Sequence, residues 1–218
     1  MKVVIFLGAP GSGKGTQSDM LVSQNNFIKI STGDLLREIS SSGSDLGNKI
    51  QEIMKLGGLV SDDIVAQMLK DKLSLSKDSS VHYIFDGFPR TLNQAKILEN
   101  IIKDVDSEVL VSVLLLEVDE QVVVDRIAGR FFCGDCKENY HEVYKESKVS
   151  GVCDLCGAAN MQKREDDKSN IVLSRINTYN DQIKPITEFY QSRYKVKKIR
   201  AEKHYQEVYQ DILSSVNI

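Results

Sequence analysis

The sequence lacks several features that would place the protein outside the class of ordinary globular proteins. It has no run of about 18 apolar residues, the length that a membrane-spanning helix needs. Its first residues lack the basic, apolar and small-residue order of a signal peptide, and no repeat or long linker is found. The net charge of −3 provides no overall field that favours nucleic acid. We therefore predict a cytoplasmic protein that binds neither membrane nor nucleic acid, with one sizeable core and small insertions in its 218 residues.

A glycine-rich loop follows the first apolar stretch. Val3 to Leu7 form a short, largely β-branched run, which predicts a fully buried strand of a parallel sheet. Four of the next nine residues, Gly8 to Thr16, are glycine, so this backbone can adopt positive φ angles and lie close against a ligand. A helical pattern begins after the loop. Loop amides, a helix N-terminus and the charge of Lys14 together predict a phosphate-binding site, and the alternative is a flexible turn.

The end of this loop departs from the general phosphate-loop pattern. The spacing Gly8-x4-Gly13-Lys14 matches that pattern. However, Gly15 follows the lysine, and the hydroxyl comes one residue later, at Thr16. A Gly-Lys-Gly-Thr ending is typical of nucleoside monophosphate kinases.

Two later segments carry groups that suit a nucleotide. In STGDLLR, residues 31–37, Ser31 or Thr32 can cap a helix that carries Arg37. Val81 to Phe85 predict a strand that ends in DGFPR, residues 86–90, at the sheet edge where parallel sheets bind ligands. A carboxylate there is placed to hold a water of Mg²⁺, and the arginine can bind a phosphate through two N–H groups. The alternatives are an ordinary capped helix and an ordinary turn.

The four cysteines predict a metal site. Cys133-x2-Cys136 and Cys153-x2-Cys156 are separated by sixteen residues, a spacing typical of tetrahedral zinc. Four thiolates leave no open coordination position, so the zinc would be structural. Two disulfides are the alternative, which a reducing cytoplasm disfavours. His141 is a further candidate ligand. The segment could also be a zinc ribbon that binds nucleic acid, but the acidic residues around the cysteines disfavour binding to a polyanion.

Two arginines are predicted on one helix. A helical pattern runs from Val122 to Arg130, and the spacing of Arg126 and Arg130 places both on the same face. Like charges four residues apart weaken a helix unless an anion lies between them. The pattern therefore indicates an anion site, with a solvated basic face as the alternative.

GAPGSGKGT at 8–16, STGDLLR at 31–37 and DGFPRT at 86–91 resemble three signatures of the bacterial adenylate kinases, in the same order. The resemblance covers Lys2 to about Val216. It implies an α/β fold with a P-loop NTPase-like parallel five-stranded sheet flanked by helices, an AMP-binding helical insert and a small zinc-stapled β lid. The implied divisions are a core at 1–30, 61–128 and 168–218, an AMP-binding segment at 31–60 and a lid at 129–167. The implied enzyme is a monomer that transfers a phosphoryl group reversibly from Mg·ATP to AMP, giving two ADP, and serves adenine nucleotide homeostasis.

The resemblance also assigns roles to individual residues. It places at ATP the residues Gly11, Ser12, Gly13, Lys14, Gly15, Thr16, Arg126, Arg130, Asn139, Tyr140 and Lys203. It places at AMP the residues Thr32, Arg37, Gly58, Leu59, Val60, Gly87, Phe88, Pro89, Arg90, Gln94, Arg164 and Arg175. The catalytic group comprises Lys14, Arg90, Arg126, Arg130, Arg164 and Arg175, and Asp86 would hold Mg²⁺ through water.

Three details of the resemblance bear on specificity and on open alternatives. Thr32 favours AMP, because uridylate-cytidylate kinases usually carry alanine there, and the carboxamide of Gln94 offers adenine both a donor and an acceptor. Asp166 and Asp167 either cap the following helix or pair with lid arginines. The segment from Val196 to Lys203, where a last strand and its short polar turn are expected, departs from the family's usual Val-Asp-Gly-like sequence. A P-loop switch that hydrolyses ATP slowly is the remaining rival from another class.

Overall fold

The computed structural model describes residues 1–74, 81–106 and 108–216, and a parallel sheet forms its centre. Within these residues five strands pair in the order β2-β3-β1-β4-β8, and every pairing is parallel. The strands are β1 (Lys2–Gly8), β2 (Phe27–Ser31), β3 (His82–Asp86), β4 (Leu110–Glu117) and β8 (Val196–Arg200). The predicted five-stranded sheet is confirmed, and the strands predicted at Val3 to Leu7 and at Val81 to Phe85 lie within one residue of their expected positions.

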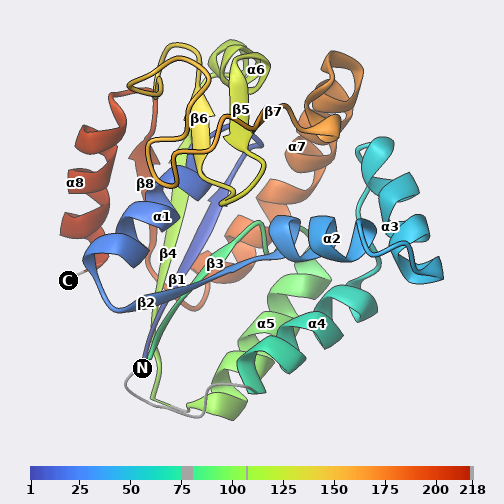
Figure 1. Ribbon diagram of the computed structural model, residues 1–218. Helices are drawn as coiled ribbons and strands as arrows, with labels where there is room; N and C mark the ends of the chain where they lie inside the picture. The colour runs from blue at the N-terminus through green and yellow to red at the C-terminus, as the bar shows by residue number, and fades with distance from the viewer. Residues whose placement is uncertain (75–80, 107, 217–218) are drawn as a thin grey trace.

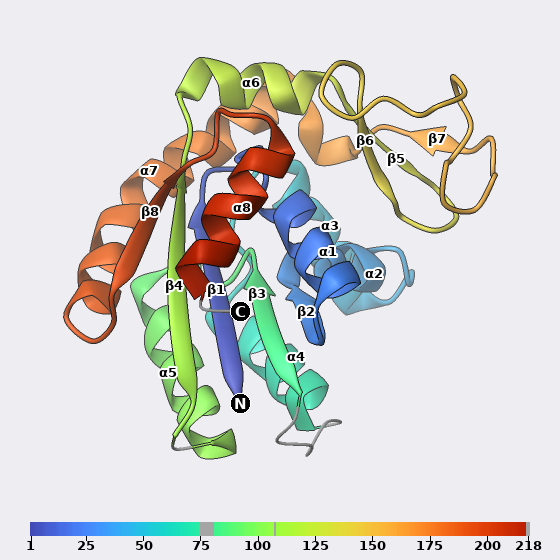
Figure 2. The same cartoon turned by 90° about the vertical axis from the view of Figure 1, so that its left-hand side faces the viewer.

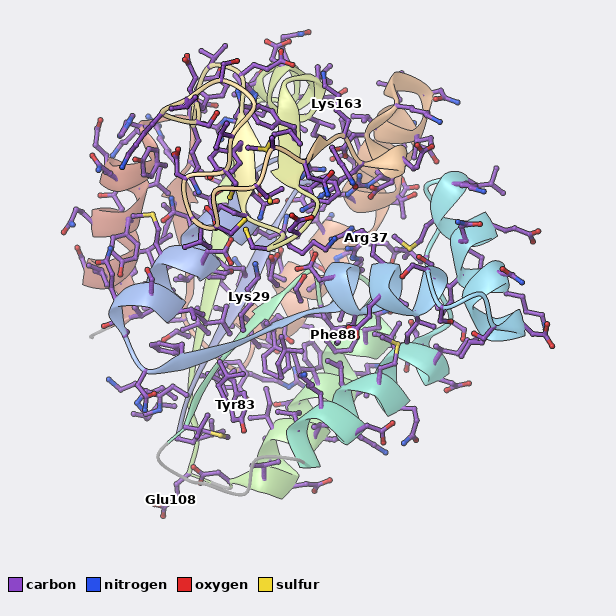
Figure 3. All side chains as sticks on the ribbon, in the orientation of Figure 1. Lys29, Arg37, Tyr83, Phe88, Glu108 and Lys163 are labelled. Atoms are coloured by element: carbon purple, nitrogen blue, oxygen red, sulfur yellow. The ribbon has the colours of Figure 1, made fainter. Side chains whose placement is uncertain are left out.

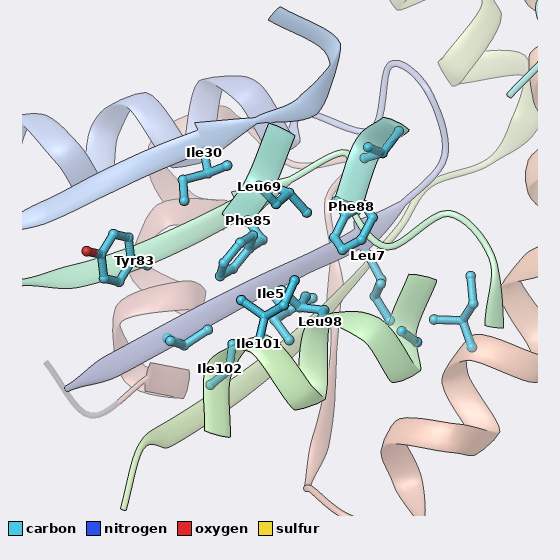
Figure 4. Close-up of a cluster of buried hydrophobic side chains, with 14 of the residues drawn as sticks. Ile5, Leu7, Ile30, Leu69, Tyr83, Phe85, Phe88, Leu98, Ile101 and Ile102 are labelled. Carbon is cyan, nitrogen blue, oxygen red and sulfur yellow. The ribbon is translucent and has the colours of Figure 1, made fainter. Parts of the chain in front are cut away.

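Helices cover both faces of the sheet (Figures 1 and 2). One face carries α1 (Lys14–Gln24) and α8 (Tyr205–Val216), and the other carries α4 (Asp62–Ser74), α5 (Leu92–Val105) and α7 (Ser169–Gln191). Because side chains alternate along a strand, Val3, Ile5 and Leu7 pack into the α4–α5–α7 core (Figure 4), whereas Val4 and Phe6 pack into the core beneath α1 and α8. This two-sided burial explains why β1 is an unbroken apolar run.

Two helices follow β2 at the carboxyl end of the sheet. They are α2 (Thr32–Ser40) and α3 (Asp45–Lys55). Ser31 caps α2 by accepting a hydrogen bond from the Asp34 N–H at 3.3 Å, and Ser44 caps α3 by accepting one from the Gly47 N–H at 3.0 Å. Of the two cap residues proposed for α2, Ser31 is therefore the one used.

A small antiparallel sheet projects from the carboxyl end of the main sheet (Figure 2). Its strands, in the order β6-β5-β7, are β5 (Arg130–Cys133), β6 (Asn139–His141) and β7 (Met161–Gln162). The 3₁₀ helix η1 (Glu165–Asp167) then leads into α7. Among the described helices, none is both long enough and apolar enough to cross a bilayer.

The prediction that Arg126 and Arg130 share a helix face is wrong. Helix α6 (Glu120–Ala128) ends before Gly129, and Arg130 is the first residue of β5, paired with His141. The imidazole of His141 packs directly against Gly129, where a Cβ atom would lie 2.6 Å from its Cε1. Tertiary pairing with β6 therefore ends the helix two residues earlier than the sequence spacing predicts.

Candidate nucleotide-binding site

The loop between β1 and α1 has the geometry of an anion-binding loop. Gly13 caps α1 with a φ of 96° and makes no side-chain hydrogen bond to the first amides of the helix. Gly11 has a φ of 79°, and a Cβ atom there would lie 2.8 Å from Ile127 Cγ1. Both positions need glycine, one for the helix terminus and the other for the close approach of α6.

Lys14 lies inside this loop. Its ammonium donates hydrogen bonds to the carbonyls of Gly8 and Ala9, both at 2.7 Å, and to Ser12 Oγ at 3.3 Å. The Lys14 pKa is lowered to about 8, chiefly by burial; Asp86 offsets part of this shift, and Arg90 and other nearby arginines add to it. An anion that binds in the loop would therefore stabilise the protonated form of Lys14.

Five arginines from separate elements converge beside the loop. Arg37 comes from α2, Arg90 follows β3, Arg130 begins β5, Arg164 precedes η1 and Arg175 lies on α7. Burial, followed by the nearest arginines, lowers the pKa of both Arg90 and Arg164 to about 10, so both remain charged at neutral pH. Such crowding of buried cations is suited to ligands that carry several phosphates.

Two aspartates of η1 bind these arginines. Asp167 pairs with Arg130 and, at 3.3 Å, with Arg175. Asp166 pairs with Arg175 at 3.0 Å and lies 3.8 Å from Arg37. The structure shows these acids paired with arginines, but of the partners only Arg130 belongs to the predicted lid, since Arg37 lies on α2 and Arg175 on α7.

A cleft of ≈ 290 Å³ brings together the residues predicted for ATP. All of them line it, together with Asp86 at the end of β3: Gly11, Ser12, Gly13, Lys14, Gly15, Thr16, Arg126, Arg130, Asn139, Tyr140 and Lys203. The sequence therefore identified one continuous surface from segments far apart in the chain.

A second cavity, of ≈ 40 Å³, adjoins the cleft. Ten of the residues predicted for AMP line it, namely Thr32, Arg37, Gly58, Leu59, Val60, Gly87, Phe88, Arg90, Gln94 and Arg175. The other two, Pro89 and Arg164, line the larger cleft. Arg37, Arg90 and Arg175 border both cavities, which places three cations where ligands in the two cavities would meet.

Thr32 and Gln94 provide polar groups to the smaller cavity, and both are buried. Thr32 donates to the Gly87 carbonyl at 2.7 Å. The Gln94 carboxamide accepts from the Arg90 N–H at 2.7 Å and donates to Asp62 Oδ1 at 2.8 Å. An amide has two lone pairs and two N–H groups, so one of each remains for a ligand.

Arg126 reaches the turn that follows β8. It donates to the Ala201 carbonyl at 2.7 Å and lies 5.4 Å from the centroid of the Tyr144 ring. In the same turn, the ammonium of Lys203 pairs with Asp211 at 2.9 Å. Despite its unusual sequence, this turn thus forms a wall of the cleft.

The four cysteines lie at one end of the small sheet. Their Sγ atoms are all within 4.8 Å of one another. Cys133 and Cys156 approach to 3.6 Å and Cys136 and Cys153 to 3.4 Å. A disulfide needs about 2.05 Å, whereas tetrahedral zinc with bonds of about 2.3 Å separates its sulfur ligands by about 3.8 Å. The thiols therefore fit a tetrahedral metal better than a disulfide. His141 lies outside the cluster, and its Nδ1 accepts from the Val143 and Tyr144 amides.

Several residues that line the cleft were not predicted from the sequence, among them Lys29, Tyr144, Tyr179 and His204. Lys29 is a charged residue within β2, and the sequence assigned it no role. Tyr179 lies one helical turn after Arg175 on α7, and only the tertiary position of α7 reveals that this face lines the cleft.

Comparisons with known proteins agree with this arrangement. The family model described as "Adenylate kinase" matches residues 6–195. A curated adenylate kinase of Rhizorhabdus wittichii is 42% identical over 196 residues, which is 90% of each chain. The adenylate kinase of Listeria innocua is 39% identical over 97% of each chain, and that of Thermosipho africanus is 39% identical over 98% of each chain.

Proposed function

Because the chain belongs to the adenylate kinase family, and so transfers a phosphoryl group reversibly between ATP and AMP, we propose that its larger cleft binds ATP and its smaller cavity binds AMP. The observation that carries this proposal is the position of Arg37, Arg90 and Arg175 on the border of both cavities. Three cations there can bind the acceptor phosphate and the group in transfer. Lys14 and the loop amides hold the donor phosphates.

The proposed chemistry is positioning together with charge stabilisation. The acceptor is a phosphate oxygen that is already ionised near neutral pH, so no general base is required. Two polyanions must be brought together in line and away from water. Arg37 comes from the segment 31–60, and Arg130 and Arg164 come from the segment 129–167. We infer that these segments close over the nucleotides as the AMP-binding segment and the lid.

An adenylate kinase uses ATP together with Mg²⁺. We assign the metal-bound water to Asp86, whose carboxylate oxygen Oδ2 lies close behind the loop, 3.6 Å from the position of a Cβ atom on Gly15. The bound ion would supply positive charge to the phosphates. The chain's part is to present the carboxylate at the end of β3.

A structural zinc ion is our proposal for the cysteine cluster. The tetrahedral spacing of the four Sγ atoms supports it, and so does the small core around them, in which Cys133, Cys153 and Tyr140 are the buried members. Thiols that bind metal stay reduced, which agrees with a cytoplasmic location. We further propose that the enzyme acts as a monomer without nucleic acid or membrane partners.

Replacing Gln94 is expected to impair the use of AMP more than that of ATP. Gln94→Met removes a buried donor and acceptor from the smaller cavity, and losing such groups costs about 1–3 kcal/mol. We expect the KM for AMP to rise roughly tenfold, with the KM for ATP within a factor of about two. Steady-state kinetics with each nucleotide varied in turn measures both. Gln67→Met, on the exposed face of α4, is the matched control, and an equal loss for both nucleotides would contradict the assignment.

The affinity for ATP is expected to fall as the pH rises through about 8. The Lys14 pKa of about 8 means that the unliganded enzyme loses this charge above that pH, while ATP binds the protonated form. The dissociation constant should then rise about tenfold per pH unit, and ATP binding should take up a proton. Calorimetry at pH 7 to 9.5 in buffers of different ionisation enthalpy measures both quantities. A Lys14→Arg variant should lack this dependence, and a flat profile for the unaltered enzyme would refute the assignment.

A further inference from the structure

Lys29 is a charged residue in a strand that is otherwise largely apolar. It lies on β2, on the same strand face as Ser31, whose backbone pairs with Asp86. The long side chain runs toward the carboxyl end of the sheet and is 16% exposed. It lines the larger cleft, and Figure 3 labels it where β2 passes beside α1.

The ammonium of Lys29 contacts two carboxylates from different elements. It donates a hydrogen bond to Asp19 Oδ1 of α1 at 2.8 Å and lies 3.7 Å from Asp86 Oδ2 at the end of β3. Burial alone would lower the Lys29 pKa, but Asp86 and Asp19 raise it above its ordinary value. Lys29 therefore remains charged, and it joins α1 to the carboxyl end of β3.

This ion pair lies directly behind the phosphate loop. A Cβ atom on Gly15 would be 3.6 Å from Asp86 Oδ2 and 3.9 Å from Lys29 Nζ. The Asp86 side chain is 14% exposed, so the pair is only weakly screened by solvent. The contact to Lys29 is made through Oδ2, which leaves the other carboxylate oxygen for a second partner.

We propose that Lys29 is a positioning residue for Mg·ATP: anchored by Asp19, it fixes the Asp86 carboxylate so that its second oxygen serves a metal-bound water. This proposal rests on the assignment of Asp86 to Mg²⁺ made above. Lys29 itself touches no reacting atom. The alternative is that Lys29 merely ties α1 to the sheet, in which case its loss affects stability alone.

Calorimetric titration of ATP, without AMP, in the presence and absence of Mg²⁺ tests this proposal. The quantity of interest is the gain in ATP affinity that Mg²⁺ provides. We expect Lys29→Gln to reduce this gain roughly tenfold, the usual effect of removing a partner that orients a metal site, and to leave the metal-free affinity within about twofold. Lys29→Arg keeps the charge and should restore the gain. Lys198→Gln, which breaks an exposed pair between Lys198 on β8 and Glu117 on β4, is the charge-matched control.

A double-mutant cycle with Asp86→Asn separates the two assignments. Asp86→Asn should also reduce the Mg²⁺-dependent gain, and adding Lys29→Gln to it should cause no further loss, because both changes act through one carboxylate. Additive losses, or a lower melting temperature of Lys29→Gln with an intact gain, would overturn the positioning role while leaving Asp86 as the metal residue. If Asp86→Asn alone keeps the full gain, the assignment of Mg²⁺ to Asp86 fails, and the role of Lys29 fails with it.

Discussion

Lys14→Met is expected to lower kcat by about 100- to 1,000-fold, the usual cost of removing a preorganised charge that stabilises a transition state. The Lys14 ammonium lies within the loop and donates hydrogen bonds to the carbonyls of Gly8 and Ala9. A bound donor phosphate would replace these carbonyls as the partner of the ammonium. Methionine has a similar length and no charge. A coupled assay of ADP formation measures the loss.

The fold of the Lys14→Met variant should remain intact. Burial lowers the Lys14 pKa, so its protonated form opposes folding at neutral pH, and the variant is expected to melt at the same temperature or higher. Lys184→Met, a change at an exposed lysine of α7, is the control and should leave kcat unaltered. If Lys14→Met turns over at nearly the rate of the unaltered enzyme, the assignment of the donor phosphates to this loop is wrong.

Removing the metal is expected to lower the melting temperature by roughly 6–12 °C, which corresponds to a loss of about 3 kcal/mol in a chain of this size. The small sheet has few buried apolar residues besides its cysteines, so we expect the proposed metal to supply most of its stability. Calorimetry before and after treatment with a chelator measures the shift, and metal analysis of the fresh protein identifies the ion.

The matched variant for this experiment is Cys156→Ser, at the exposed ligand position. It should melt at the lower temperature without treatment, and the chelator should change it little further. Hydrogen exchange should localise the loss of protection to residues 129–167. Freshly purified protein that contains no zinc, or a melting temperature that chelation leaves unchanged, would contradict the structural role.

The sequence predicted best those features that depend on local patterns. A few neighbouring residues are enough to predict the apolar run of β1, the loop from Gly8 to Thr16 and the paired cysteine knuckles. The structure places each of them as expected. The residues that the resemblance assigns to ATP and AMP line the larger cleft and the smaller cavity that adjoins it.

Features set by contacts between distant segments were not predicted. The position of Arg130 depends on the pairing of β5 with β6, and helical spacing alone placed it wrongly. The choice of Asp166 and Asp167 as partners of arginines depends on how η1 packs against α2 and α7. Lys29 is a similar case, because its carboxylate partners lie on α1 and β3 and become neighbours only in the folded chain.

The most direct test of the two-cavity site is ADP formation from ATP with each nucleoside monophosphate in turn. We expect AMP to be the preferred acceptor by a wide margin, two ADP to form for each ATP consumed, and almost no ADP to form when the acceptor is omitted. A preference for UMP, CMP or GMP, or steady ATP consumption without any acceptor, would contradict the assignment of the smaller cavity to AMP.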